Sequence, residues 1–564
     1  MAAGMDHVVE GPPATQTTAE SSEDLGRVTV ATELEPGQRL RLVKFLGYGW
    51  SSRRSLPSVR DQVEAALAAA ALSGWEGLLS AQRDYLDDFW DRADVEIEGD
   101  AELQQAVRFA LFHVLQAGAR AEGRAIAAKG LTGPSYDGHT FWDTETFVLR
   151  PLTYTVPHAV GDALRWRHAT LDLAQERAKT LGFQGAAFPW RTIRGHECSG
   201  YWPAGTAAFH INADIADAID RYLVATGDDT FEREAGLELL VETARLWLSL
   251  GHHDAHGRFR IDGVTGPDEY SAIADNNVYT NLMAQKNLQV AADVVERHPD
   301  RAWELGVYPD EMAAWRDAAR ATFVPYDEAL GVHPQAEQFT DHAVWDFAHT
   351  GPDQYPLMLH FHYFDLYRKQ VVKQADLVLA LYLRGDAFSP EAKARNFEYY
   401  EPLTVRDSSL SAFAQAVVAA EVGHLELAYD YFGEAALLDL GDLHHNTRDG
   451  VHLASLAGVW IAAVAGFGGM RDYDGSLSFA PRLPQQLSHL AFRLLFRGRR
   501  IRVEVDHQQA HYTLLRGDPL DVRHHGATVT LAPDEPVTRP IPKPPSREAP
   551  VQPPGRAPAR RQPT

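Results

Sequence analysis

Residues 59–71 read Val-Arg-Asp-Gln-Val-Glu-Ala-Ala-Leu-Ala-Ala-Ala-Ala, with Val63, Ala66, Leu67 and Ala70 spaced three and four positions apart. This spacing is typical of an amphipathic helix. The pattern returns in residues 76–94 and then near residues 100–119, 157–180, 209–226, 233–251, 279–297, 310–322, 371–384, 409–421, 424–438 and 452–465. We therefore expect residues 57–468 to form one array of helices, which makes the chain mainly α.

Three connections in this array are long, near residues 181–208, 254–278 and 325–368, and they carry Gly, Pro, Trp and acidic residues. Simple helix bundles usually join their helices by short loops, whereas long loops rich in such side chains more often carry a site. The pattern favours an α/α barrel or helical toroid over a generic bundle.

The two ends of the chain differ from the centre. Residues 1–36 are rich in Ala, Thr, Ser, Glu and Gly, and we expect them to be disordered. Residues 37–56 hold one alternating strand, and residues 469–534 show period-two segments that predict a small antiparallel β domain. Residues 535–564 are rich in Pro, with six Arg or Lys against one Glu from residue 536 onward, and predict a disordered basic tail.

Composition excludes several classes of protein. The 564 residues carry a net charge of −24, which disfavours nucleic-acid and anionic-membrane partners. The single cysteine, Cys198, excludes an internal disulfide framework and a cysteine-rich metal site. No apolar run reaches membrane-spanning length, and the histidines lack a metal-ligand spacing on one helix face. We expect a cytoplasmic protein without a bound metal.

Two clusters in the first half of the array combine carboxylates with aromatic side chains. In Gly138-His-Thr-Phe-Trp-Asp-Thr-Glu-Thr-Phe147, the neighbours Trp142 and Asp143 suit a sugar ring, although a buried Trp beside a helix-capping Asp is the commoner arrangement. In Thr265-Gly-Pro-Asp-Glu-Tyr270, the Gly-Pro turn projects Asp268 and Glu269 from an irregular loop. A carboxyl group among aromatics suits a general acid, but a hydrated acidic turn is the commoner case.

Two further clusters lie in the second half. Arg368-Lys-Gln-Val-Val-Lys-Gln-Ala-Asp376 offers Lys373 and Gln374 to ligand hydroxyls, unless Lys373 simply forms a surface ion pair with Asp376. Glu401-Pro-Leu-Thr-Val-Arg-Asp-Ser-Ser-Leu-Ser411 places Arg406 before two serines at an expected helix start. A capping serine is the default for such a segment, but the hydroxyls and the guanidinium could also cradle an oxyanion.

These motifs occur in one order, together with Gly185-Ala-Ala-Phe-Pro-Trp190 and Glu337-Gln-Phe339, and the chain from about Arg39 to Leu531 resembles glycoside hydrolase family 65. That family contains inverting α-glucoside phosphorylases, acting on maltose, trehalose or kojibiose, and some hydrolases. The resemblance implies an (α/α)6 barrel, a small C-terminal β domain and an N-terminal β-sandwich. Because only one strand is evident near the start, we expect most of that sandwich to be missing.

The resemblance also implies roles for individual residues. Glu269 would be the general acid, and the glucosyl unit would be bound by Trp142, Asp143, Lys373 and Gln374. Phosphate would be bound by Arg406, Ser408 and Ser409, where Arg406 replaces the His that many phosphorylases of the family carry. The family is often dimeric, so a homodimer is implied as well. Inorganic phosphate would be a co-substrate, and no organic cofactor is implied.

Three functions stay open. An inverting hydrolase needs a carboxylate base, whereas a phosphorylase needs phosphate-binding donors; Arg406 cannot act as a base, which favours phosphorolysis of an α-linked glucose disaccharide. Glu401, Asp407 and Asp449 lie close in sequence and could instead serve hydrolysis. The expected loss of the N-terminal domain motivates the third reading, a non-catalytic carbohydrate-binding remnant.

Overall fold

The computed structural model describes residues 1–51, 54–119, 123–545 and 547–562, and the chain divides into two compact units, Met1–Asp91 and Arg92–Thr564. Residues 52, 53, 120–122, 546, 563 and 564 belong to segments discussed above but lie outside the described residues.

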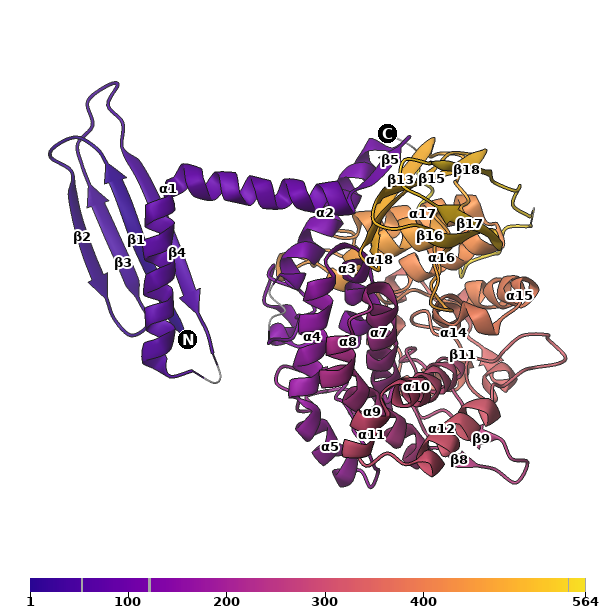
Figure 1. Ribbon diagram of the computed structural model, residues 1–564. Helices are drawn as coiled ribbons and strands as arrows, with labels where there is room; N and C mark the ends of the chain where they lie inside the picture. Colours follow the sequence, from indigo (N-terminus) through magenta and orange to yellow (C-terminus); the bar gives the residue numbers. More distant parts are fainter. Residues whose placement is uncertain (52–53, 120–122, 546, 563–564) are drawn as a thin grey trace. The chain divides into compact units, whose positions relative to one another are not determined.

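The first unit is built from two antiparallel strand pairs and nearly all of the long helix α1 (Leu56–Ala93) (Figure 1). Strand β1 (Ala2–Glu10) pairs with β4 (Arg41–Gly49), and β2 (Gln16–Ser21) pairs with β3 (Gly26–Ala31). The expectation that residues 1–36 are disordered is therefore wrong, as is the expectation of a single residual strand. The partner of β1 lies about thirty residues further along the chain, so the pattern within residues 1–36 did not show the pairing.

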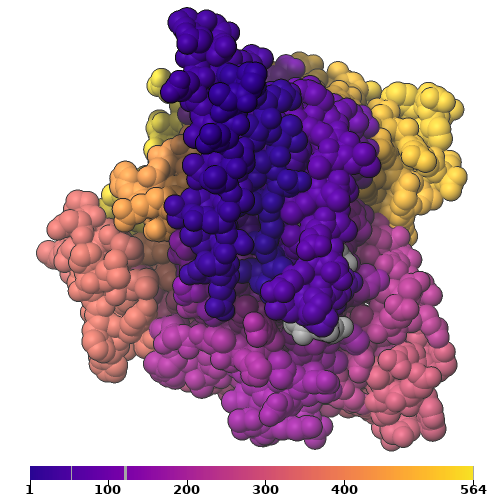
Figure 2. Space-filling view, turned by 90° about the vertical axis from the view of Figure 1, so that its left-hand side faces the viewer, coloured from indigo at the N-terminus to yellow at the C-terminus, as the bar shows by residue number. Residues whose placement is uncertain are grey.

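Glycines let helix α1 approach the β1–β4 pair closely. A Cβ atom on Gly4 or Gly49 would lie 2.9 Å or less from side-chain atoms of Leu67 or Val63, respectively. Val63 is buried against these strands, and Gly74 interrupts the helix with non-helical backbone angles (φ 67°, ψ 174°). Figure 2 shows the surface of the earliest residues, in indigo, as one continuous band.

The second unit contains the predicted helical array. Its helices are α2 (Ala101–Gly118), α3 (Leu149–Thr155), α4 (Pro157–Ala169), α5 (Leu171–Thr180), α6 (Trp202–Ala207), α7 (His210–Thr226), α8 (Asp229–Phe231), α9 (Leu237–Leu250), α10 (Val278–Arg297), α11 (Pro299–Glu304), α12 (Pro309–Ala321), α13 (Tyr363–Leu366), α14 (Leu377–Leu383), α15 (Pro390–Tyr400), α16 (Ala412–Val422), α17 (Leu425–Leu437) and α18 (Leu453–Ile461). Helix α2 packs against α17 and α18, so the array closes on itself.

A small antiparallel β domain follows the helices, as predicted (Figure 1). Its main sheet has the order β18 (Val537–Pro540), β15 (Gln509–Arg516), β14 (Arg499–Val505), β13 (His489–Phe496) and β5 (Val95–Glu98). Strands β16 (Leu520–His524) and β17 (Ala527–Leu531) pair beside it, together with the short β12 (Ser478–Phe479). Strand β5 comes from just before α2, so the sheet joins both ends of the second unit.

The basic tail is not free of structure, contrary to expectation. Strand β18 adds its first residues to the sheet, and later tail side chains bind acidic groups of the helical array, among them Glu401, Asp407 and Asp100. The charge arithmetic explains this attraction. The +5 charge of residues 536–564 leaves −29 on the rest of the chain, so the tail meets a surface of opposite sign.

Candidate active site

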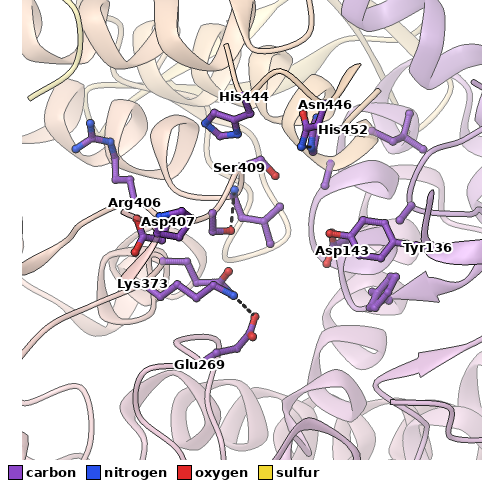
Figure 3. Close-up of a pocket in the computed structure, with 18 of the residues that line it drawn as sticks. Tyr136, Asp143, Glu269, Lys373, Arg406, Asp407, Ser409, His444, Asn446 and His452 are labelled. Atoms are coloured by element: carbon purple, nitrogen blue, oxygen red, sulfur yellow. Dashed lines mark hydrogen bonds and ion pairs between the residues drawn. The ribbon is translucent and has the colours of Figure 1, made fainter. Parts of the chain in front are cut away.

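All eight residues singled out from the sequence line one cavity of about 560 Å³ in the second unit (Figure 3). They are Trp142, Asp143, Glu269, Lys373, Gln374, Arg406, Ser408 and Ser409. The cavity is bordered by the short strand β6 (Thr140–Phe141), by loops after Gly266 and Val372, and by the turn before α16. Segments separated by more than 250 residues in sequence thus converge on one hollow.

The loop that carries Glu269 is held by its neighbour Asp268. The Asp268 carboxylate is fully buried and accepts hydrogen bonds from the backbone N–H of Lys373 at 2.8 Å and from Gln335 Nε2 at 2.8 Å. Its backbone N–H donates in turn to Asp376 at 3.2 Å. Both acids were expected to project from this loop. Instead, Asp268 joins the loop to the segment that contains Lys373, and Glu269 faces the cavity.

Glu269 and Lys373 form an ion pair at the cavity wall, with Lys373 Nζ 2.9 Å from Glu269 Oε1 and side-chain exposures of 10% for Lys373 and 17% for Glu269. The alternative that Lys373 pairs with Asp376 on the surface is wrong. Asp376 is buried beneath the loop, where it accepts hydrogen bonds from Asn277 Nδ2 at 3.1 Å. Loss of hydration and the nearby Asp268 raise the pKa of Asp376 to about 8.

Gln374 also supports the acid loop. Its Nε2 donates to the carbonyl oxygen of Pro267, which precedes Asp268. The residue borders the cavity but is largely buried. Its amide nitrogen therefore fixes the loop, while the side chain remains part of the cavity wall.

Trp142 and Asp143 both line the cavity, and Figure 3 shows Asp143 facing the hollow beside Tyr136, across from Lys373. Removal from water, with an added contribution from Glu269, raises the pKa of Asp143 to about 7. Trp142 is only 2% exposed and packs edge-on against Phe147 and His210. The indole is therefore mostly part of the barrel core, whereas Asp143 presents a carboxyl group that can both donate and accept hydrogen bonds near neutral pH.

Arg406 borders the cavity, but its guanidinium is engaged elsewhere. Its Nε lies 3.1 Å from Glu434 Oε1, and the group stacks 4.9 Å over the ring of Tyr431. In Figure 3 the side chain points away from Ser409. The guanidinium thus has a carboxylate partner, Glu434, that lies 28 residues away in sequence, and its binding of phosphate stays a prediction.

Ser408 and Ser409 do line the cavity, in a turn rather than at a helix start. Helix α16 begins at Ala412, and Arg406 has a left-handed backbone conformation (φ 55°) before the turn. The Ser408 hydroxyl accepts a hydrogen bond from the backbone N–H of Leu410 at 3.3 Å. The two hydroxyls are placed by this turn.

Sequence reasoning missed a group of polar residues around the same turn, of which His444, Asn446 and His452 are seen in Figure 3. His452 Nδ1 lies 2.8 Å from a carboxylate oxygen of the buried Asp439. The other ring nitrogen, Nε2, lies on the edge of the imidazole away from Asp439. The cavity wall also includes Lys129 and, from the tail, Arg556. The signal that could have pointed to His444 is that its segment leads into the buried helix α18.

The three carboxylates proposed as alternatives for water activation differ in position. Glu401 is buried and bonded to Gln415 at 2.9 Å, and neither Glu401 nor Asp449 is among the described residues that line the cavity. Asp407 borders it, with Oδ2 accepting from Tyr270 and from the Leu357 backbone, each at 2.8 Å. Its Oδ1 lies 3.2 Å from Arg556. The Asp407 carboxylate is thus held by three protein groups: the Tyr270 hydroxyl, the Leu357 backbone N–H and the Arg556 guanidinium.

Family models match almost the whole chain. The glycosyl hydrolase family 65 central catalytic domain matches residues 108–461, the C-terminal domain of that family matches residues 470–531, and its N-terminal domain matches residues 1–89. The chain belongs to glycosyl hydrolase family 65. The expectation that the N-terminal domain is missing is therefore wrong, and the strand pairs of the first unit agree with this correction.

Relatives of this family 65 chain include an uncharacterized glycosyl hydrolase of Mycobacterium tuberculosis, 62% identical over 100% of this chain and 72% of the relative. An alpha,alpha-trehalose phosphorylase of Geobacillus stearothermophilus is 46% identical over 82% of this chain and 61% of that protein. A solved structure of a kojibiose phosphorylase candidate from the human microbiome superposes with a TM-score of 0.85, at 27% identity, over 95% of this chain and 72% of that one. The protein is a family 65 enzyme with the (α/α)6 barrel expected from its motifs.

Within residues 1–51, 54–119, 123–545 and 547–562, no helix has the length and apolar character needed to cross a membrane. Over the same residues, no three His, Cys, Asp or Glu side chains are grouped as metal ligands would be.

Proposed function

We propose that this family 65 enzyme catalyses the inverting phosphorolysis of an α-linked glucose disaccharide, releasing β-glucose 1-phosphate and glucose. The observation that carries the proposal is the polar turn of Ser408 and Ser409, bordered by His452 and Arg556. Hydroxyl and imidazole groups suit an oxyanion, and Arg556 pairs with the adjacent carboxylate of Asp407, whose charge would otherwise repel it. The names of the relatives at 46% and 40% identity, both alpha,alpha-trehalose phosphorylases, support the same reaction.

In the proposed reaction Glu269 is the general acid. A phosphate oxygen forms a bond to the anomeric carbon from the face opposite the leaving group. The bond from that carbon to the glycosidic oxygen breaks, its electron pair stays on the oxygen, and the oxygen takes the proton of Glu269. Attack from the opposite face converts the α-linkage into a β-phosphate.

The Glu269–Lys373 ion pair must open before this step, because Lys373 Nζ lies 2.9 Å from the carboxylate oxygen that has to reach the glycosidic oxygen. A bound sugar hydroxyl would accept a hydrogen bond from Lys373 in place of Glu269. The Glu269 side chain would then be free to turn toward the glycosidic oxygen. Asp143 would bind the same glucosyl unit from the opposite wall.

The proposal includes inorganic phosphate as co-substrate, a small α-glucoside as substrate and no metal or organic cofactor. A cytoplasmic location and a homodimer belong to it as well. Arg406 is assigned to holding the turn rather than to the phosphate itself, because its guanidinium binds Glu434.

Hydrolysis is the competing function, since Asp143 is a carboxyl group across the cavity from Lys373 and could activate a water there. One assay separates the two. The purified chain is incubated with trehalose, kojibiose and maltose, with and without inorganic phosphate, and the products are identified by anomer-resolved NMR. We expect phosphate-dependent β-glucose 1-phosphate. Free β-glucose formed from the glucosyl unit at a phosphate-independent rate would establish hydrolysis, and no turnover on any sugar would contradict both.

A further inference from the structure

The C-terminal tail reaches the active site. From residue 547 onward it contacts the helical array at successive points: Arg547 lies 3.5 Å from Glu398, Gln552 Nε2 donates to the buried Glu401 at 3.0 Å, and Arg561 binds the buried Asp100 at 2.6 Å. Between these contacts, Arg556 enters the wall of the active-site cavity. A segment with the composition of a disordered tail is thus fixed at both sides of Arg556.

Arg556 donates hydrogen bonds to the turn that precedes Ser408. Its Nε donates to the carbonyl oxygen of Val405 at 2.6 Å, and its Nη2 donates to the carbonyl oxygen of Arg406 at 3.1 Å. Nη2 also lies 3.2 Å from Asp407 Oδ1, and the guanidinium stacks 4.7 Å over the ring of Tyr355. One side chain therefore binds three consecutive residues of the turn.

These three residues need such a partner for two physical reasons. Arg406 has a left-handed backbone (φ 55°), which an arginine adopts only when its surroundings hold it there. Asp407 has a side chain that is 1% exposed, and burial raises its pKa. A charged Asp407 would repel an incoming phosphate, and Arg556 is the cation that forms an ion pair with it.

We propose that Arg556 is a positioning residue for phosphate: it fixes residues 405–407 so that the following serines face the cavity, and it neutralises Asp407 beside the phosphate. The tail is then a working part of the active site rather than an appendage. This inference rests on the proposed phosphorolysis, because it assigns the phosphate end of that same cavity.

Arg556→Ala in the full chain tests the inference, with Arg547→Ala as matched control. Arg547 lies in the same tail and pairs with Glu398 outside the cavity. We expect Arg556→Ala to raise the KM for phosphate by about tenfold or more, which corresponds to the loss of one charge-assisted hydrogen bond. The KM for sugar should change by less than about twofold. Arg547→Ala should match the wild type, and Arg556→Lys should recover part of the loss because it restores the charge beside Asp407 but not the two-point contact.

The outcomes separate this inference from the proposed function. A wild-type enzyme that turns over sugar without any dependence on phosphate would overturn both. A phosphate-dependent wild type, with Arg556→Ala indistinguishable from Arg547→Ala, would overturn only the role of Arg556. Equal increases in both KM values, or thermal unfolding of both Arg556 variants below the assay temperature, would likewise overturn it by showing a general structural role.

Discussion

Two sides of the active-site cavity are built in different ways. The side that we propose holds the general acid, called the acid side below, consists of Glu269 and Lys373, which come from two loops joined through the buried Asp268. The side that we propose binds phosphate, called the phosphate side below, consists of Ser408, Ser409, His452 and Arg556, which come from a turn, a helix start and the C-terminal tail. Short sequence motifs therefore specify the acid side, whereas the phosphate side depends on contacts between segments as much as 148 residues apart. Substitutions on the two sides should differ in kind: the acid side should affect the chemical step and sugar binding, and the phosphate side should affect phosphate binding.

Glu269→Gln should have the largest effect on the acid side. The amide keeps the shape of the side chain but has no proton to give to the glycosidic oxygen, so turnover of an unactivated disaccharide should fall by about 10²–10⁴-fold. Steady-state rates measure this effect. Glu304→Gln is the control, because the Glu304 side chain is exposed and forms an ion pair with Arg301 within helix α11. Near-normal turnover of Glu269→Gln would contradict the assignment of the general acid to this side of the cavity.

Asp143→Ala tests the wall that faces the acid side, and its effect should come next in size. The cavity carboxyl group is lost, so turnover should fall and the KM for the disaccharide should rise by about tenfold or more, since charged hydrogen-bond partners contribute about 1.5–3 kcal/mol. The KM for phosphate should change less. Asp137→Ala is the matched control, because Asp137 lies in the preceding turn with its side chain 84% exposed. Equal effects of the two substitutions would contradict a sugar-binding role of Asp143.

Arg406, which the sequence analysis assigned to phosphate, gives a further test of the phosphate side. Arg406→Ala removes the pairing with Glu434 and the stacking on Tyr431, so we expect it to lower the free energy of unfolding by about 1–3 kcal/mol. Ser409→Ala should instead raise the KM for phosphate with little change in stability. Thermal melts and phosphate titrations of both variants check this, and the reverse pattern would return the guanidinium of Arg406 to the phosphate.

The same contrast explains what could be predicted from the sequence. Helical periodicity and the period-two segments predicted the helical array and the β domain, because each signal lies within one element. Glu269, Asp143 and Lys373 were found because their motifs are contiguous. The pairing of β1 with β4, the entry of β5 into the C-terminal sheet and the position of Arg556 were not, because each depends on a partner far along the chain. For Arg406, the neighbouring residues in the sequence suggested that it binds an anion, whereas the folded chain places Glu434 beside it.

The smallest predicted effect concerns the buried carboxyl groups beneath the acid side. Burial and the nearby Asp268 raise the pKa of Asp376 to about 8, from 3.8 for an ordinary aspartate. Between pH 4 and pH 8 the unfolded chain has lost this proton while the folded chain retains it, so the unfolded state binds fewer protons and this group lowers stability as the pH rises. Asp376→Asn removes the titration while its side-chain oxygen can still accept from the backbone N–H of Asp268.

We therefore expect Asp376→Asn to gain stability relative to the wild type as the pH increases, by about 1–3 kcal/mol between pH 5 and pH 8. Thermal melts at both pH values measure the difference, with Asp353→Asn as control because Asp353 is exposed. The Asp353 variant should keep a constant offset from the wild type. If the offset of Asp376→Asn is equally constant, Asp376 is ionised in the folded enzyme throughout this range. The acid loop would then rest on a buried negative charge, and Lys373 would have that charge to balance as well as that of Glu269.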